Sequence, residues 1–218
     1  MRTETVGVTE TLIESAKKEF LEHGFQNANL RRISSESGVS TGSIYTRFGD
    51  KAGLFSAVVK PAADGLMELY LESITAARES GDPAEATSQG NEGTELVLKY
   101  IYENFDVFKL IFCHSAGTEY ERYFDELAEI EEKYYREFVK QFSRRENMVS
   151  DFFIHVICRT GWSYIYEVVS HDLSYDEAQI FMKSIREFCF AGWGKVLGQN
   201  YEDWACRVLV LFGFLVEL

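Results

Sequence analysis

The chain has 218 residues, of which 46% are hydrophobic, and it carries a formal net charge of −13. This length accommodates a small domain and a larger one with a substantial core, while two prolines and many long-chain residues favour an all-helical fold. No signal peptide precedes the first expected helix, and the apolar runs are far shorter than the roughly 20 residues that cross a bilayer. We therefore expect a cytoplasmic protein without a membrane partner.

The negative charge is concentrated in the larger, C-terminal part of the chain. Residues 1–60 carry eight basic and seven acidic residues, a net charge of +1, whereas residues 61–218 carry 14 and 28, a net charge of −14. Within residues 30–57 four cations face two acids. This thin basic footprint predicts limited non-specific affinity for nucleic acid and binding that is sensitive to salt.

Motifs that would indicate catalysis or a bound cofactor do not occur in the sequence. There is no glycine-rich phosphate loop, HExxH, GxSxG or CxxC pattern, so we predict neither an enzyme nor a cofactor. The four cysteines lie in apolar runs and are expected to be reduced thiols. Cys113–His114 and His155–Cys158 are more typical of core or helix-end residues than of a metal site, and we predict none.

A first helix is expected over residues 9–23, with a stripe of apolar residues on its inward face. Gly24 is expected to end this helix, and Phe25 to pack back against it. Residues 1–8 form a short arm that precedes it.

Residues 30–55, LRRISSESGVSTGSIYTRFGDKAGLF, predict two short helices joined by a tight turn. Asn29 is placed to cap the first helix, and Ser40 to cap the second. Gly38 falls where the first helix must end in the left-handed conformation, which a residue without Cβ adopts at low cost. Ile44 is expected to point back and hold the second helix against the first.

The outer face of the second short helix carries small, hydroxylated and cationic residues where a solvated helix usually has Glu, Lys and Gln. Such a face suits the DNA major groove, because hydroxyls and cations bind phosphates and base edges. We predict DNA contacts from ten residues of this segment: Asn29, Arg31, Arg32, Thr41, Gly42, Ser43, Tyr45, Thr46, Arg47 and Lys51. The alternative is a helical hairpin that does not bind DNA.

Lys51 is expected in the first turn of the next helix, which Asp50 can cap. A cation at that position opposes the helix dipole, so internal structure alone does not call for it. If a DNA phosphate lies there, backbone N–H groups and Lys51 would bind it together. The alternative is a solvated lysine.

Residues 9–59 resemble the N-terminal domain of the tetracycline-repressor (TetR) family of bacterial transcriptional regulators. The resemblance rests on FLEHGF and on the ordered run GVSxGxxYxxFxxKxxLF. It implies that Tyr45 and Lys51 hold phosphates and that Asn29 caps its helix near the DNA backbone. It further implies that four residues face bases: Thr41, Gly42, Ser43 and Thr46. Ser34 and Thr41 depart from the alanine and the cation that the family often has there, so we do not predict the operator sequence.

Residues beyond 50 predict a long first helix and then a bundle. Pro61 marks either a boundary between two helices or a hinge in one helix. Residues 80–93 predict a surface loop. Further helices are expected over residues 94–104, 105–115, 119–145, 150–170 and 175–198. In the helix over 119–145, the expected inner face carries Phe124, Leu127, Ile130, Tyr134, Phe138 and Phe142, and Glu131 and Glu132 are expected to be solvated on the outer face.

The last two of these helices predict a dimer interface. Residues 152–169 are apolar nearly all round, so this helix must be covered on most sides. Glycines in both helices are expected where a neighbouring helix approaches closely. Pairing with a two-fold mate would form a four-helix interface, which the resemblance favours over an intrachain core. The expected interface residues are Phe153, Ile157, Gly161, Ile185, Phe188, Gly192 and Trp193.

Aromatic residues of the body predict a site for a small hydrophobic or aromatic effector, since tyrosines combine an apolar ring with a polar tip. The candidates are Tyr70, Tyr100, Phe105, Phe108, Tyr134, Phe138, Trp162 and Tyr166. A lipophilic cation held by Glu103 or Asp106 is one form that such an effector could take.

The sequence thus predicts an all-α chain with two parts: residues 1–50, a three-helix helix-turn-helix DNA-binding head, and residues 51–218, a helical effector-binding and dimerisation domain. The expected function is a ligand-responsive transcriptional repressor that binds a palindromic double-stranded DNA operator as a homodimer and is released by a small molecule. Two alternatives remain: a DNA-binding architectural or protein-regulated factor of the same fold, and a helical enzyme or carrier. The apolar segment 201–218 has no functional interpretation.

Overall fold

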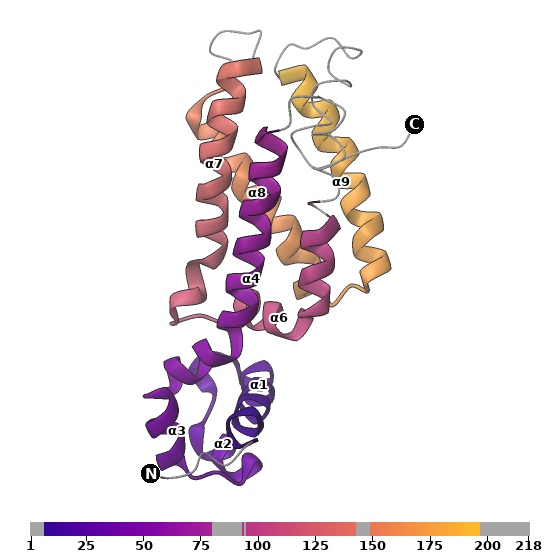
Figure 1. The fold of residues 1–218 in the computed structure, drawn as a ribbon. Coiled ribbons are helices and arrows are strands. Elements are labelled where there is room, and N and C mark those ends of the chain that lie inside the picture. Colours follow the sequence, from indigo (N-terminus) through magenta and orange to yellow (C-terminus); the bar gives the residue numbers. More distant parts are fainter. Residues whose placement is uncertain (1–6, 80–92, 94, 143–148, 197–218) are drawn as a thin grey trace. The chain divides into compact units, whose positions relative to one another are not determined.

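The computed structural model describes residues 7–79, 93, 95–142 and 149–196, and all regular structure among these residues is helical (Figure 1). The predicted all-α fold is therefore confirmed. The loop expected over residues 80–93 and the segment 201–218 lie outside the described residues, apart from Gly93. Chain contacts define two compact units, Met1–Gly65 with Asn104–Tyr123, called the head unit, and Leu66–Glu103 with Phe124–Leu218, called the body unit. The functional boundary after residue 50 stays a prediction.

The head unit contains three helices that lead into a long fourth one. These are α1 (Val8–Asn27), α2 (Leu30–Ser37), α3 (Thr41–Phe48) and the first part of α4 (Lys51–Glu79), joined by α6 (Phe105–Cys113) and the 3-10 helix η1 (Glu119–Arg122) (Figure 1). The core of the unit is built from fully buried side chains: Leu12, Ala16, Phe20, Ile33, Ile44, Leu54 and Phe55.

Gly24 and Phe25 behave as the sequence predicts. Gly24 has a left-handed φ of 69° and interrupts α1, although helical residues continue to Asn27. The Phe25 ring packs against Phe20 and Phe55, with ring centroids 6.2 Å and 5.4 Å apart. Its backbone N–H donates to the His114 carbonyl at 3.0 Å, which ties the end of α1 to α6.

Pro61 lies inside α4, so the interpretation of this residue as a boundary between two helices is wrong. The proline removes one backbone donor, but the turns on either side provide buried apolar side chains that hold the helix in place. Val58, Val59, Ala62 and Ala63 are all at most 7% exposed.

The body unit is a bundle of the later part of α4, helical residues 95–103, α7 (Tyr123–Phe142), α8 (Asp151–Ser170) and α9 (Tyr175–Val196). Its core includes Leu66, Ile101, Leu127, Ile154, Ile165, Val169 and Met182. Ser150 caps α8 by accepting a hydrogen bond from the Phe153 N–H at 3.1 Å. Among the helices that the structure describes, none combines the length and the apolar character needed to span a membrane.

Candidate nucleic-acid interface and body site

The helix-turn-helix segment is capped as its sequence predicts. Asn29 Oδ1 accepts a hydrogen bond from the Arg31 N–H at 2.9 Å and begins α2, and Ser40 Oγ accepts from the Ser43 N–H at 3.3 Å and begins α3. Between them, Gly38 ends α2 with a φ of 69°, the conformation for which only glycine is well suited. These local contacts fix the angle at which α3 leaves the turn.

The N-terminus of α4 is also capped as expected. Asp50 Oδ1 accepts a hydrogen bond from the Gly53 N–H at 2.8 Å, and Gly49 before it has a φ of 80°. Because both ends of α3 are held by hydrogen bonds and glycine turns, this short helix does not depend on its own weak propensity.

The outer face of α3 is available to a ligand. Tyr45 is 55% exposed, and Gly42 and Thr46 are exposed as well, whereas Thr41 and Ser43 are half-buried. Thr46 Oγ1 donates to the Gly42 carbonyl at 2.8 Å, which leaves the hydroxyl oxygen free to accept. The inner face is fixed by Ile44, which is fully buried.

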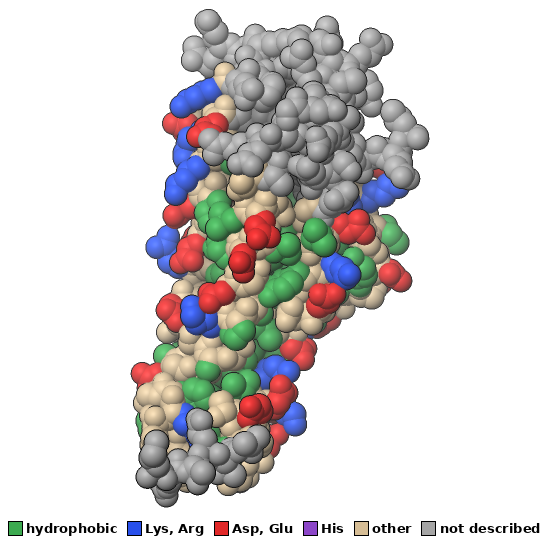
Figure 2. Space-filling view, in the orientation of Figure 1, with side chains coloured by type: hydrophobic (Ala, Val, Ile, Leu, Met, Phe, Trp, Pro, Cys, Tyr) green, Lys and Arg blue, Asp and Glu red, His purple; other side chains and the backbone are tan. Residues whose placement is uncertain are grey.

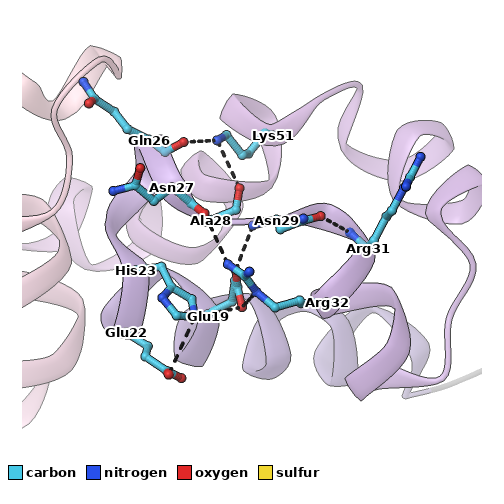
Figure 3. Close-up of polar contacts among 10 residues, drawn as sticks. All are labelled: Glu19, Glu22, His23, Gln26, Asn27, Ala28, Asn29, Arg31, Arg32 and Lys51. Carbon is cyan, nitrogen blue, oxygen red and sulfur yellow. Dashed lines mark hydrogen bonds and ion pairs between the residues drawn. The ribbon is translucent and has the colours of Figure 1, made fainter.

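Arg32, predicted to contact DNA, is paired with Glu19, although its side chain is 50% exposed (Figure 3). Its Nε lies 2.8 Å from Glu19 Oε1 and its Nη2 lies 2.5 Å from the same oxygen, which also accepts from the Asn29 N–H at 2.7 Å. Burial of the Glu19 carboxyl would raise its pKa, but hydrogen bonds from Arg32 and Asn29 outweigh that effect, and the pKa is lowered. Arg32 therefore stabilises the junction of α1 and α2.

Lys51 has an internal role that the sequence interpretation did not foresee. Its ammonium donates to the carbonyls of Gln26 and Ala28, at 3.0 Å and 3.2 Å, and lies 4.7 Å from the centroid of the Phe25 ring (Figure 3). The expectation that internal structure does not call for a cation here is thus wrong. A cation is needed to satisfy carbonyl groups at the C-terminal end of α1.

Arg31 and Arg47 differ in their surroundings. The Arg31 side chain is exposed and points away from the Glu19–Arg32 pair (Figure 3), and no ion pair or hydrogen bond joins its guanidinium to another described residue. Arg47 is half-buried and donates to Thr9 Oγ1 at 3.1 Å. Of the four predicted cations, Arg31 is the one most open to an anion.

The predicted effector residues fall into both units. Phe105 and Phe108 belong to the head unit, and Phe108 is fully buried, while Tyr70, Tyr100, Tyr134, Trp162 and Tyr166 belong to the body unit. The Phe138 side chain is outside the described part. Tyr70 and Trp162 meet edge to face at 5.1 Å, and Phe124 lies 6.3 Å from Trp162 and 6.1 Å from Tyr166. The aromatic candidates of α4 and α8 thus come together, along with Phe124.

Glu131 and Glu132 lie in the interior, so the expectation that they are solvated is wrong. Glu132 is 6% exposed, and Glu131 Oε2 is buried without a hydrogen-bond partner among the described residues. The stripe that α7 buries contains Tyr123, Leu127, Ala128, Glu132 and Tyr135, about one residue out of register with the predicted apolar face. Because the prediction assigned glutamates outward by type, it missed both acids. The helical spacing of Leu127, Ala128 and Tyr135 was the feature of the sequence that could have indicated the buried face of α7.

The predicted interface residues of α8 and α9 differ in exposure. Phe153, Ile157, Gly161 and Ile185 are half-buried, Phe188 and Gly192 are exposed, and the side chain of Trp193 lies outside the described part. Large exposed apolar side chains of these helices also include Phe152 (74%) and Ile180 (69%). Figure 2 shows hydrophobic side chains among charged ones on one face of the body.

In the described chain, no three His, Cys, Asp or Glu side chains gather in a metal-binding group.

Residues 12–58 match the family model of bacterial regulatory proteins of the tetR family. The transcriptional repressor AcnR of Corynebacterium glutamicum is 37% identical over 62 residues, which cover 28% of this chain and 33% of AcnR. AcnR of Corynebacterium efficiens is 35% identical over 68 residues, 31% of this chain and 36% of that protein. The matches thus span about a third of the length of these curated relatives.

Solved structures resemble more of the chain. The TetR-family regulator PfmR from Thermus thermophilus has a TM-score of 0.57 at 19% identity, over 78% of this chain and 92% of that one. The ketosteroid transcriptional regulator KstR2 of Mycobacterium tuberculosis has a TM-score of 0.58 at 15% identity, over 89% and 95%. At these identities the likeness concerns the fold. The chain therefore shares the fold of these solved regulators, with a helix-turn-helix head and a helical body. Residues 12–58 of the chain match the N-terminal domain of the tetR family.

Proposed function

We propose that this protein is a transcriptional repressor that acts in the cytoplasm, binds a palindromic DNA operator as a homodimer and is released by a small effector. The observation that carries the proposal is the outer face of α3, held between two glycine turns and presenting Tyr45, Gly42 and Thr46 to solvent. A short rigid helix with hydroxyls on its outer face can enter the major groove without losing internal contacts.

The predicted DNA residues divide into two groups under this proposal. Arg31, Tyr45 and Thr46 have exposed side chains, and we assign them direct contacts to phosphates or bases. Arg32 and Lys51 bind internal acceptors, and they would act on DNA mainly by fixing the backbone of α2 and the start of α4. The exposed group should change the salt dependence of binding when it is mutated.

Arg31→Ala is expected to weaken binding to every DNA sequence by roughly tenfold and to lower the slope of log K against log salt by about one. The reason is the loss of one phosphate contact without loss of a fold contact, because the Arg31 guanidinium has no ion pair within the described chain. Fluorescence anisotropy with an operator selected from a random pool provides the measurement. Lys60→Ala is the matched control, since Lys60 is an exposed cation of the same unit that pairs with Asp64 at 3.1 Å. An unchanged slope for Arg31→Ala would exclude this phosphate contact.

The dimer is proposed to form through α8 and α9. Phe152, Ile180 and Phe188 are large apolar side chains that are 74%, 69% and 72% exposed, which is unusual for a face in contact only with water. A Cβ built at Gly192 meets no described atom within 4 Å, so a second chain could approach the backbone there. When α8 and α9 of one protomer pack against the same two helices of a two-fold mate, they form a four-helix contact.

The double variant Ile180→Glu with Phe188→Glu is expected to convert the dimer to a monomer at micromolar concentration, because four buried carboxylates per dimer would lack cations. Size-exclusion chromatography with light scattering measures the mass directly. Lys183→Gln, an exposed change on α9, is expected to leave the dimer intact. A parent protein that is monomeric under these conditions refutes the proposed interface.

A further inference from the structure

Two glutamates that are neighbours in α7 have opposite electrostatic surroundings. Glu132 accepts hydrogen bonds from Arg159 and, at 3.0 Å, from Arg136, and lies 2.9 Å from His155 Nδ1. Glu131 Oε2 has no hydrogen-bond partner within the described structure, although it is buried. Since burial of an unpaired carboxylate costs several kcal/mol, Glu131 calls for an explanation that Glu132 does not.

The surroundings of Glu131 are aromatic and contain a second unpartnered polar atom. Trp162 Nε1 of α8 is buried and has no hydrogen-bond partner within the described chain. The ring of Tyr70, from α4, meets the Trp162 indole edge to face at 5.1 Å. Burial raises the pKa of Glu131 to about 8, and a hydrogen-bonding interaction with the Trp162 side chain, too weak in geometry to count as a hydrogen bond in the structure, opposes this effect in part. A carboxyl acceptor from α7, an indole N–H donor from α8 and the aromatic rings of Tyr70 and Trp162 therefore lie close together.

The backbone beside the carboxylate carries no side chain. A Cβ built at Gly161 would lie 3.9 Å from Glu131 Oε2, an ordinary van der Waals contact, and would meet no other atom within 4 Å apart from the nearby backbone of α8 and its chain neighbours. Gly161 itself is half-buried, so the backbone of α8 is partly accessible beside the buried carboxyl oxygen. The glycine leaves room next to the one oxygen that lacks a donor.

We propose that Glu131 and Trp162 form the recognition point for the effector, and that the effector is an aromatic organic cation with N–H donors, such as an aryl amidinium or ammonium. The ligand's N–H groups would donate to the carboxylate, and its ring would stack on the aromatic side chains of α4 and α8. This inference rests on the proposed function, in that it names the chemistry of the effector. The surplus of acidic residues over residues 61–218, a net charge of −14, favours a cation over an anion.

Binding of a cation should release a proton below pH 8, because the carboxyl that is protonated in the free protein must ionise. The groups facing Glu131 do not compete in this range. Burial raises the pKa of Tyr70 and Tyr135 well above their usual value and also raises that of the Cys158 thiol, so all three stay neutral. Arg136 and Arg159 both pair with Glu132 and not with Glu131. Affinity is therefore expected to fall about 25-fold from pH 8.5 to pH 6.5.

Isothermal titration calorimetry on the full-length protein tests the proposal with two matched probe pairs. Benzamidine, a cation, is compared with its neutral isostere benzamide, and phenylguanidinium, a cation, with its neutral isostere phenylurea. We expect at least one cation to bind more tightly than its counterpart, and Glu131→Gln to lower that affinity by roughly 10- to 100-fold. Glu126→Gln, an exposed change on the same helix, should leave it unchanged. Trp162→Phe, which removes the indole N–H, should lower the affinity less.

Failure of the effector chemistry and failure of the repressor function are distinguishable. If neither cation binds better than its counterpart, or if Glu131→Gln binds as the parent does, the proposed recognition point is wrong whatever the DNA result. If the cation binds through Glu131 but the parent retains no selected DNA at low salt, the repressor proposal fails while the cation site stands. Release of bound DNA by the binding cation, absent in Glu131→Gln, supports both.

Discussion

Arg159→Met is expected to lower the free energy of unfolding by about 3–5 kcal/mol at pH 7, because it removes a cation from a buried carboxylate. Glu132 is 6% exposed, and Arg159 is its most closely approaching partner. Arg159 Nε also lies 3.4 Å from Asp125, so the same side chain joins α8 to two acids of α7. After the substitution, Glu132 would keep Arg136 and His155, which are 37% and 43% exposed at their side chains and are screened by water. Urea unfolding followed by circular dichroism measures the change.

Lys99→Met provides the matched control for this prediction. Lys99 forms an ion pair with Glu103 at 3.8 Å, and both side chains are 59% exposed, so its loss should change the unfolding free energy by less than about 1 kcal/mol. Arg159→Met combined with Glu132→Leu should recover much of the stability, since no unpaired charge stays buried. If Arg159→Met behaves like Lys99→Met, the ion cluster does not stabilise the body.

The pH dependence of the Glu132 cluster has a defined sign. Burial would raise the pKa of Glu132, but the hydrogen bonds from Arg159 and the charges of Arg159 and His155 lower it below its usual value of 4.5. The cluster therefore contributes its full stability above pH 4.5 and loses it as pH falls through the lowered pKa.

Local signals explain why the head could be predicted closely from its sequence. Asn29, Gly38, Ser40 and Asp50 act on atoms within three residues of themselves, so their residue type and spacing indicate the caps and turns directly. Lys51 could not be assigned in this way. Its acceptors on Gln26 and Ala28 lie 25 and 23 positions earlier, and only the packing of α1 against α4 brings them within reach.

The body was less predictable because its polar residues do not follow their average preferences. Helix α7 buries Glu132 and one oxygen of Glu131, so an assignment by residue type rotated the helix by about one residue. Of the predicted effector residues, Tyr70 of α4 and Trp162 of α8 are in contact, whereas Phe105 and Phe108 fall in the head unit. Distances between helices determine these relations, and the sequence carries no direct record of them.

Glu131→Gln is expected to stabilise the protein by about 2–5 kcal/mol at pH 8.5 and to have little effect near pH 4.5. The folded protein holds the Glu131 proton up to a pKa of about 8, whereas the unfolded chain releases it near 4.5. Since the native state binds more protons between these values, stability falls as pH rises from 4.5 to 8. The full shift corresponds to about 5 kcal/mol, and the half-buried position of the residue as a whole lowers the expected figure.

Urea unfolding at pH 5, 7 and 8.5 measures this effect, with Glu126→Gln as the exposed control on the same helix. Above pH 4.5 the two neighbouring glutamates change the free energy of unfolding in opposite directions, because Glu132 stabilises the fold and Glu131 destabilises it. Their contributions can therefore be told apart. A parent protein whose stability relative to Glu131→Gln is the same at pH 5 and pH 8.5 would show that this carboxyl is solvated or paired in solution. A cation that binds at Glu131 should remove the penalty at pH 8.5 in the parent and have no such effect in Glu131→Gln, since it supplies the charge that the helices of the body do not.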